Sequence, residues 1–232
     1  MNKKDASENS HKGHRENVRR RFVVGGLEVF APHEILELLL FYAIPQKDTN
    51  PIAHRLMKTY GSLGRVLSAP ASELQTIEGV GERTAVLLSL VFQLNRWIRM
   101  NELEARGVNC QSIDSVGEYL TEVFSGMEHE AVYELCFDQR GDLVMKHCMA
   151  NGNINSVSTD ICSLVRNALF NHCEYVIIAH NHPGGDAAPS EEDYDATRRI
   201  QAALAKVNLT LLDHIIVGDG DYFSLRKAQF FT

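Results

Sequence analysis

Residues 175–193 read YVIIAHNHPGGDAAPSEED, and this stretch decides the fold of the second half of the chain. Its opening residues are almost continuously apolar, which is typical of a strand covered on both faces. Because side chains at positions i and i+2 of a strand point to one face, His180 and His182 emerge together at its end. A proline and two glycines then turn the chain, and Ser190 is the predicted N-cap of a helix with Asp193 at its third position. We expect this helix to bring the Asp193 carboxylate towards the two imidazoles.

Two histidines and a carboxylate form a ligand set typical of catalytic zinc, in which three protein ligands leave a fourth position for water. Each residue also has a structural explanation. An H-x-H sequence can end a strand without any metal, and Ser190 with Asp193 is an acceptable capping pair. The convergence of all three at one strand–turn–helix junction favours the metal. The sequence therefore predicts one Zn²⁺ per chain, held by His180, His182 and Asp193.

The flanking sequence alternates between strand and helix patterns. Two strand-like runs, 132–137 and 143–148, are joined by a polar turn and predict a hairpin. Helical spacing follows over 159–172 and 191–207, and a second buried strand covers 210–217. This alternation predicts an α/β layered domain over residues 110–232.

The first half of the chain has helical patterns instead. Residues 1–16 are polar and predict a disordered tail, and 17–108 predict a small helical domain. Within it, residues 77–85 match the helix-hairpin-helix pattern h-x-G-h-G-x-x-x-A. Its two glycines, Gly79 and Gly81, allow a tight turn whose amides can hold a phosphate, and Arg83 would add a charge contact. The same motif also serves as a helix-packing element.

Composition excludes several classes of protein. The chain of 232 residues is 44% hydrophobic and 23% charged, as in soluble globular proteins. It has no apolar run of the roughly 18–20 residues that span a bilayer, and no signal peptide at its polar N-terminus, so we expect a cytoplasmic protein without a membrane partner. Five scattered cysteines, none spaced as C-x-x-C, argue against a disulfide framework and a zinc ribbon.

The charge is unevenly distributed. Residues 1–108 contain 15 Lys and Arg against 12 Asp and Glu, whereas residues 109–232 contain 8 against 18. The second half would repel a phosphate backbone, so any DNA contact has to be made by the first half. Its balance of +3 is small for tight DNA binding.

The segment from His180 to Asp193 resembles the JAMM motif, H-x-H-P followed by P-S-x-x-D, of the MPN/JAB metalloprotease domains. Together with residues 212–218 it is similar to the RadC branch in particular, and the resemblance covers roughly residues 15–232. It implies an α/β fold with a mixed sheet flanked by helices, of the MPN/JAB, deaminase-like layered type, preceded by a small all-helical helix-hairpin-helix domain. It also implies a zinc metallopeptidase-like hydrolase that cleaves an amide or isopeptide bond in an unknown protein or peptide substrate.

A zinc hydrolase needs a carboxylate that takes the proton of the attacking water. The family places a glutamate at the start of an early strand, eight positions before an aspartate, and the pair Glu130 and Asp138 fits that register. Glu134 is the alternative base, although an acid inside the strand would need a partner. Glu128 is a third candidate. By the resemblance, Ser190 would donate a hydrogen bond to the oxyanion of the tetrahedral intermediate.

Other zinc enzymes fit less well. The sequence His33-Glu34-Ile35-Leu36-Glu37 lacks the second histidine of a zincin helix, and the H-x-E and P-C-x-x-C motifs of nucleotide deaminases are absent. The chain departs from RadC relatives at 160–163, where Asp-Ile-Cys-Ser replaces the typical His-Pro-Arg-Glu run. The competing hypothesis is a DNA-associated repair or binding protein whose metal site is structural or vestigial.

Overall fold

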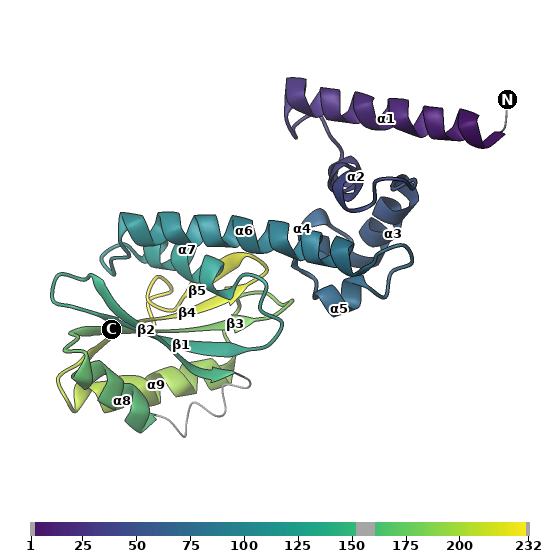
Figure 1. The fold of residues 1–232 in the computed structure, drawn as a ribbon. Coiled ribbons are helices and arrows are strands. Elements are labelled where there is room, and N and C mark those ends of the chain that lie inside the picture. The colour runs from purple at the N-terminus through teal and green to yellow at the C-terminus, as the bar shows by residue number, and fades with distance from the viewer. Residues whose placement is uncertain (1–2, 152–160, 231–232) are drawn as a thin grey trace. The chain divides into compact units, whose positions relative to one another are not determined.

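The structure, a computed structural model, describes residues 3–151 and 161–230. The chain divides into two compact units, Met1–Asn95 and Arg96–Thr232, and helix α6 (Glu82–Arg106) contributes to both (Figure 1). The second part of α6 belongs to the second unit because Met100 and Leu103 pack against its core. This division lies upstream of the boundary predicted between residues 108 and 110. No described helix is long and apolar enough to span a lipid bilayer.

The first unit, as far as the structure describes it, is helical. Its helices are α1 (Lys3–Gly25), α2 (Pro32–Ala43), α3 (Asn50–Tyr60), α4 (Leu63–Ser68), α5 (Ala71–Leu74) and the first part of α6. Pro32 stands in the first turn of α2, where its missing N–H costs nothing. The main core of the unit is made of fully buried aliphatic side chains from several of these helices, among them Leu36, Leu40, Leu56, Leu74 and Leu88.

Helix α1 covers most of the segment predicted as a disordered tail. The side chain of Arg15 is buried, and its guanidinium group donates hydrogen bonds to the carbonyls of Ile44 (2.8 Å) and Pro45 (2.8 Å). A third bond goes to the carbonyl of Lys47. One turn away, Val18 packs in a small apolar cluster with Phe30 and Phe41. The composition of residues 1–16 did not indicate this anchor because it depends on a single arginine.

The second unit is built on a mixed sheet of five strands in the order β2-β1-β3-β4-β5 (Figure 1). Only β3 and β4 are parallel; the other neighbours are antiparallel. Along the chain the elements are α7 (Ile113–Phe124), β1 (Ala131–Phe137), β2 (Leu143–Asn151), α8 (Ile161–Phe170), β3 (Tyr175–His182), α9 (Glu191–Ala205), β4 (Thr210–Gly218) and β5 (Asp221–Ser224).

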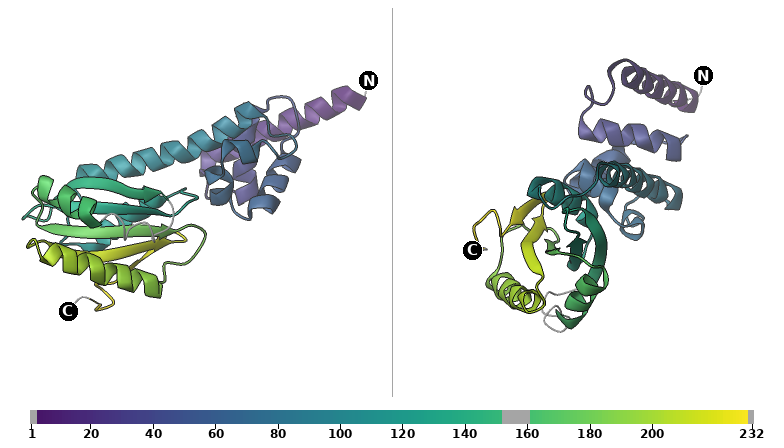
Figure 2. Two further views of the ribbon diagram at one scale, coloured as in Figure 1. Left: turned by 90° about the horizontal axis from the view of Figure 1, so that it is seen from below. Right: turned by 90° about the vertical axis from the view of Figure 1, so that its left-hand side faces the viewer.

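Helices cover both faces of this sheet. On one face Ile177 and Ala179 join a core with side chains of α7, and on the other Val176 and Ile178 pack against α8 and α9. Figures 1 and 2 show α8 and α9 together on the face opposite α7. This double cover explains why β3 is a nearly continuous apolar run. The even-numbered residues of β3, and therefore His180 and His182, lie on the face covered by α8 and α9.

Strand β4 contains a bulge that matters for the site. Val176 pairs with Leu211, but the next residue of β3, Ile177, pairs with Asp213, so Leu212 is an extra residue in β4. An inserted residue reverses which face each later side chain occupies. Leu211 and His214 therefore lie on the same face, although they are three residues apart and would lie on opposite faces of a regular strand. This places His214 on the α9 side of the sheet, together with His180.

The fold class predicted from the sequence is confirmed: a mixed α/β sheet flanked by helices and preceded by a helical region. The predicted hairpin is present as β1 and β2. The helix predicted over 159–172 is α8, and residues 159 and 160 lie outside the described residues. Helix α7 and strand β5 were not predicted.

Candidate metal centre

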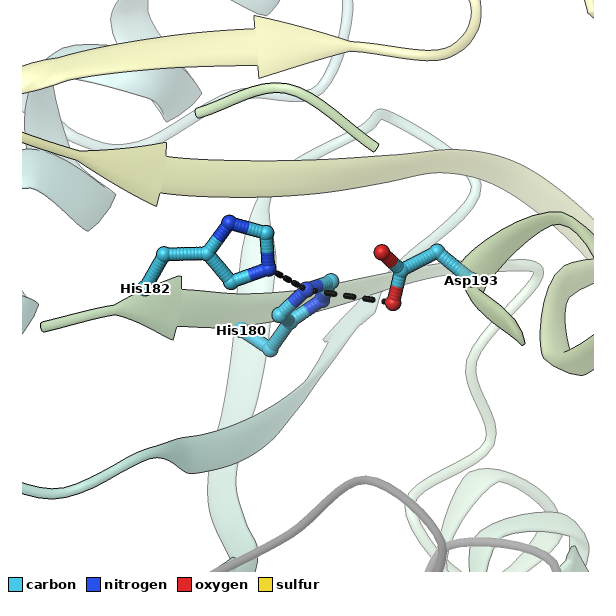
Figure 3. A group of neighbouring side chains, drawn as sticks. All are labelled: His180, His182 and Asp193. Carbon is cyan, nitrogen blue, oxygen red and sulfur yellow. Dashed lines mark hydrogen bonds and ion pairs between the residues drawn. The ribbon is translucent and has the colours of Figure 1, made fainter. Parts of the chain in front are cut away.

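His180, His182 and Asp193 bring one donor atom each to a common point (Figure 3). The Nε2 atom of His180 lies 3.1 Å from Nε2 of His182 and 3.3 Å from Oδ1 of Asp193. Two donors bound about 2.0–2.1 Å from a tetrahedral zinc ion lie about 3.3 Å apart. Both distances from His180 therefore match the spacing of zinc ligands, and all three donor atoms lie within 4.8 Å of one another. Among the described residues, no fourth His, Cys, Asp or Glu joins this group.

The Asp193 carboxylate is aimed by the start of α9. Ser190 is the N-cap of this helix, and its backbone N–H and its hydroxyl both donate to Oδ2 of Asp193 at 2.7 Å. The amide of Asp193 in turn donates to the Ser190 hydroxyl at 3.2 Å, which completes a capping box. Because Oδ2 is held in this way, Oδ1 is left to face His180. The cap and the ligand geometry are therefore one local structure.

The ring of His182 is held by the loop that follows it. Its Nδ1 atom lies 2.9 Å from the carbonyl oxygen of Asp186. A carbonyl can only accept, so Nδ1 carries the proton and Nε2 keeps its lone pair for a metal. Gly218 allows this loop to pass close to β4, because a Cβ atom there would lie 2.4 Å from the Asp186 carbonyl carbon.

His180 is buried and contacts a second buried histidine. Its Nδ1 atom lies 2.8 Å from Nε2 of His214, whose Nδ1 lies 2.6 Å from the hydroxyl of Thr197. Burial, together with the neighbouring imidazoles of His214 and His182, holds the pKa of His180 well below its ordinary value. Burial likewise lowers the pKa of His214 to about 4. Both rings are therefore neutral near pH 7, which is the form in which histidine binds a metal.

Comparison with known proteins agrees with this geometry. A model of the RadC-like JAB domain matches residues 110–230. The chain belongs to the RadC-like JAB domain family. It is 32% identical to a UPF0758 protein of Ruegeria pomeroyi over 94% of this chain and 96% of that protein. It is 31% identical to a UPF0758 protein of Fusobacterium nucleatum, over 94% and 97% of the two chains. The matched JAB domain contains all three candidate ligands.

Glu130, the nominated base, directly precedes β1. In the antiparallel pairing of β1 with β3, Val132 stands opposite His180. Continuing that register by two residues puts Glu130 opposite His182 and on the same face of the sheet. The side chain of Asn181 holds this segment from both sides: its Oδ1 accepts from the amide of Ala131 at 2.7 Å, and its Nδ2 donates to the carbonyl of His129 at 3.2 Å.

The alternative base, Glu134, lies deeper in the domain. It is completely buried, stands opposite Ile178 in the sheet, and accepts a hydrogen bond from the Asn167 side chain of α8 at 3.1 Å. It therefore has the partner that an acid inside a strand requires. Glu128 is exposed in the loop before β1. The role of Glu130 as the base stays a prediction. Of the three glutamates, it is the one that the extended register of β1 puts level with His182.

A cavity of about 250 Å³ lies beside His182. Its walls come from the end of α7, from the loop after β3, and from the turn between β4 and β5. The lining includes Phe124, Met127, Asn181, Pro183 and Gly218. Both apolar and polar groups line this space. Of the three candidate ligands only His182 lines this cavity.

Of the predicted helix-hairpin-helix residues in the first unit, Gly79 and Gly81 lie between α5 and α6, and Arg83 lies in the first turn of α6. Gly79 has a φ of +93°, and a Cβ atom there would meet Ile52 at 2.8 Å, so a glycine is required for packing. Gly81 has open space around its Cα, and Arg83 is exposed. The close packing supports the helix-packing explanation of the motif. DNA contact by Gly79, Gly81 and Arg83 stays a prediction.

Three residues of the site were not identified from the sequence: Asn181, Thr197 and His214. His214 lies in the stretch 212–218 that resembles RadC relatives, but no spacing rule connects it to His180. The bulge in β4 and the packing of α9 bring His214 and Thr197 to His180. At 160–163, where the chain departs from the RadC pattern, Ile161–Ser163 begin α8 and Asp160 lies outside the described residues.

Proposed function

We propose that this protein is a zinc-dependent hydrolase that cleaves an amide or isopeptide bond. The observation that carries this proposal is the convergence of two imidazoles and one carboxylate, whose donor atoms all lie within 4.8 Å of one another. A set of three protein ligands is typical of catalytic zinc, whereas structural zinc binds four. When bound there, zinc lowers the pKa of a coordinated water to about 7 and polarises a carbonyl group.

The residues of the chain would then divide the remaining work. Glu130 accepts the proton of the attacking water and passes it to the leaving amine, a role in which a positioned carboxylate contributes about 10²–10⁴-fold. The cavity that His182 lines receives a part of the substrate. Ser190 presents its hydroxyl at the edge of the site, where we expect it to support the oxyanion. Because this hydroxyl donates to Asp193 in the structure, it would have to exchange partners.

Metal content and hydrolysis test this proposal separately. Purified protein is expected to contain about one zinc per chain, and Asp193→Asn is expected to lose most of it. Wild-type protein loaded with zinc is then incubated with a peptide and isopeptide library, and products are read by mass spectrometry. Glu130→Gln should abolish cleavage while retaining zinc.

The matched control is Glu128→Gln, an exposed acid two residues away that should leave cleavage unchanged. Glu134→Gln tests the alternative base. A protein that binds zinc but cleaves nothing in the library, or a Glu130→Gln variant with full activity, would sink the hydrolytic proposal.

A further inference from the structure

A chain of buried polar groups runs from His180 back to the helix that supplies the third ligand. Nδ1 of His180 contacts Nε2 of His214 at 2.8 Å, and Nδ1 of His214 contacts the Thr197 hydroxyl at 2.6 Å. The hydroxyl contacts the backbone carbonyl of Asp193, one helical turn earlier, also at 2.6 Å. None of these four residues is more than 2% exposed. Its two ends are thus attached to two of the candidate ligands.

The direction of every hydrogen bond in this chain follows from its last member. The Asp193 carbonyl can only accept, and two oxygens 2.6 Å apart need a proton between them, so the Thr197 hydroxyl donates its single proton there. The hydroxyl can then only accept from His214, which requires the proton of His214 to be on Nδ1. In a neutral ring, Nε2 of His214 is consequently an acceptor. The proton it accepts has to come from Nδ1 of His180.

We infer that Thr197 and His214 are positioning residues that fix His180 as its Nδ1–H tautomer before a metal arrives. In this tautomer the Nε2 atoms of His180 and His182 both carry lone pairs, so their separation of 3.1 Å is that of two metal donors and not a hydrogen bond; Oδ1 of Asp193 lies 3.3 Å from the same Nε2 of His180. The inference rests on the metal-binding part of the proposed function and does not require hydrolysis.

His182 is set in the same way by a different acceptor, the Asp186 carbonyl. In both histidines the proton is therefore already on Nδ1, and Nε2 can bind a metal without a change of tautomer. Partners that orient a metal ligand in this way typically contribute 10- to 100-fold to metal affinity.

Nitrogen NMR of the metal-free, full-length protein tests the tautomers directly. In wild-type protein labelled with ¹⁵N-histidine, the proton should be on Nδ1 in both His180 and His214, with signals assigned from a His180→Ala variant. In Thr197→Val the last acceptor is lost. We expect the proton of His214 to move to Nε2 and that of His180 to move to Nε2, with zinc affinity reduced 10- to 100-fold.

Two control variants isolate the effect of the hydroxyl. Thr197→Ser keeps it and should retain both tautomers and the wild-type zinc Kd. Thr121→Val removes an equivalent hydroxyl-to-carbonyl bond within α7, from Thr121 to Gly117 at 2.9 Å, and should change neither. This variant shows how far the loss of such a bond within a helix changes the zinc Kd when His214 is not involved.

A wild-type His180 with its proton on Nε2 would overturn the inference. So would a Thr197→Val variant with unchanged zinc Kd. If that variant does not fold, the wild-type tautomer and Thr197→Ser still decide the question. A protein with the expected tautomers and zinc affinity but no hydrolysis would leave the inference standing and reject only the catalytic proposal.

Discussion

Replacing Asn181 with alanine should loosen the segment that carries Glu130. The side chain of Asn181 is 4% exposed, and its two hydrogen bonds, to the amide of Ala131 and the carbonyl of His129, lie on either side of the glutamate. Both bonds come from the face of β3 opposite the candidate ligands. The substitution therefore disturbs the start of β1 without removing a donor from the metal centre.

The size of the effect follows from the burial of the two partners. Ala131 is 2% exposed, so its amide loses its Asn181 acceptor where water has little access, at a cost of about 1–3 kcal/mol. His129 is exposed, and its carbonyl can be rehydrated, which limits the second loss to about 1 kcal/mol. We therefore expect Asn181→Ala to lower the free energy of unfolding by about 2–4 kcal/mol.

Urea unfolding of the metal-free protein measures this difference, and the chain offers a matched control. Asn109 makes the same two kinds of bond, accepting from the amide of Gln111 at 2.9 Å and donating to the carbonyl of Arg140 at 3.1 Å, but these bonds are exposed to solvent. It also donates to the carboxylate of Asp142 at 3.0 Å, which is exposed as well. Asn109→Ala should cost less than about 1 kcal/mol because water replaces the lost groups. Equal losses in the two variants would refute the role assigned to Asn181.

Three further perturbations probe other parts of the molecule. Burial lowers the pKa of His214 to about 4, so between pH 6.5 and pH 4 the unfolded chain binds a proton that the folded chain does not. The free energy of unfolding therefore has its full value above about pH 6.5 and falls by about 3 kcal/mol as the pH is lowered to 4. Urea midpoints of wild type and His214→Gln across this range should diverge, and parallel curves would contradict the assignment. Gly218→Ala should weaken zinc binding, because its Cβ would meet the backbone of Gly185 and Asp186 at 2.4–2.6 Å and displace the carbonyl that holds His182. Gly185→Ala, whose nearest contact is 3.6 Å, is the control for calorimetric titration with zinc. Arg15→Lys should make α1 more sensitive to proteolysis, because a single ammonium nitrogen does not reproduce the fork by which two guanidinium nitrogens bind the carbonyls of Ile44 and Pro45. The control is Arg20→Lys at an exposed position, which should be cleaved at the wild-type rate.

Local rules were sufficient wherever the information lies within a few residues. The period of two in a strand put His180 and His182 on one face, and the capping preference of Ser190 located the start of α9 and the place of Asp193 in it. The hairpin of β1 and β2 followed from two apolar runs with a polar turn between them. These features depend on backbone geometry and hydrogen bonds between near neighbours, which the sequence specifies directly.

The limits of sequence reasoning are clear in the first unit and at its boundary. Helix α6 looked like the last element of a helical domain, but Met100 and Leu103 on its second part pack against the sheet unit. Helix α1 extends into a polar segment because Arg15 reaches the carbonyls after α2, about 30 positions along the chain. Composition averages over such a contact, since one buried arginine hardly changes the polarity of its surroundings.

The order of amino acids was enough to identify the residues that could bind a metal: two histidines at the end of a buried strand and an aspartate at the third position of the next helix. How those residues are held depends on contacts that form only in the folded protein. An extra residue in β4 turns His214 towards His180 and Thr197, and the register of β1 against β3 sets Val132, two residues after Glu130, opposite His180. Strand register and bulges depend on packing between segments distant in sequence. A one-residue change in either would send these side chains to the other face of the sheet.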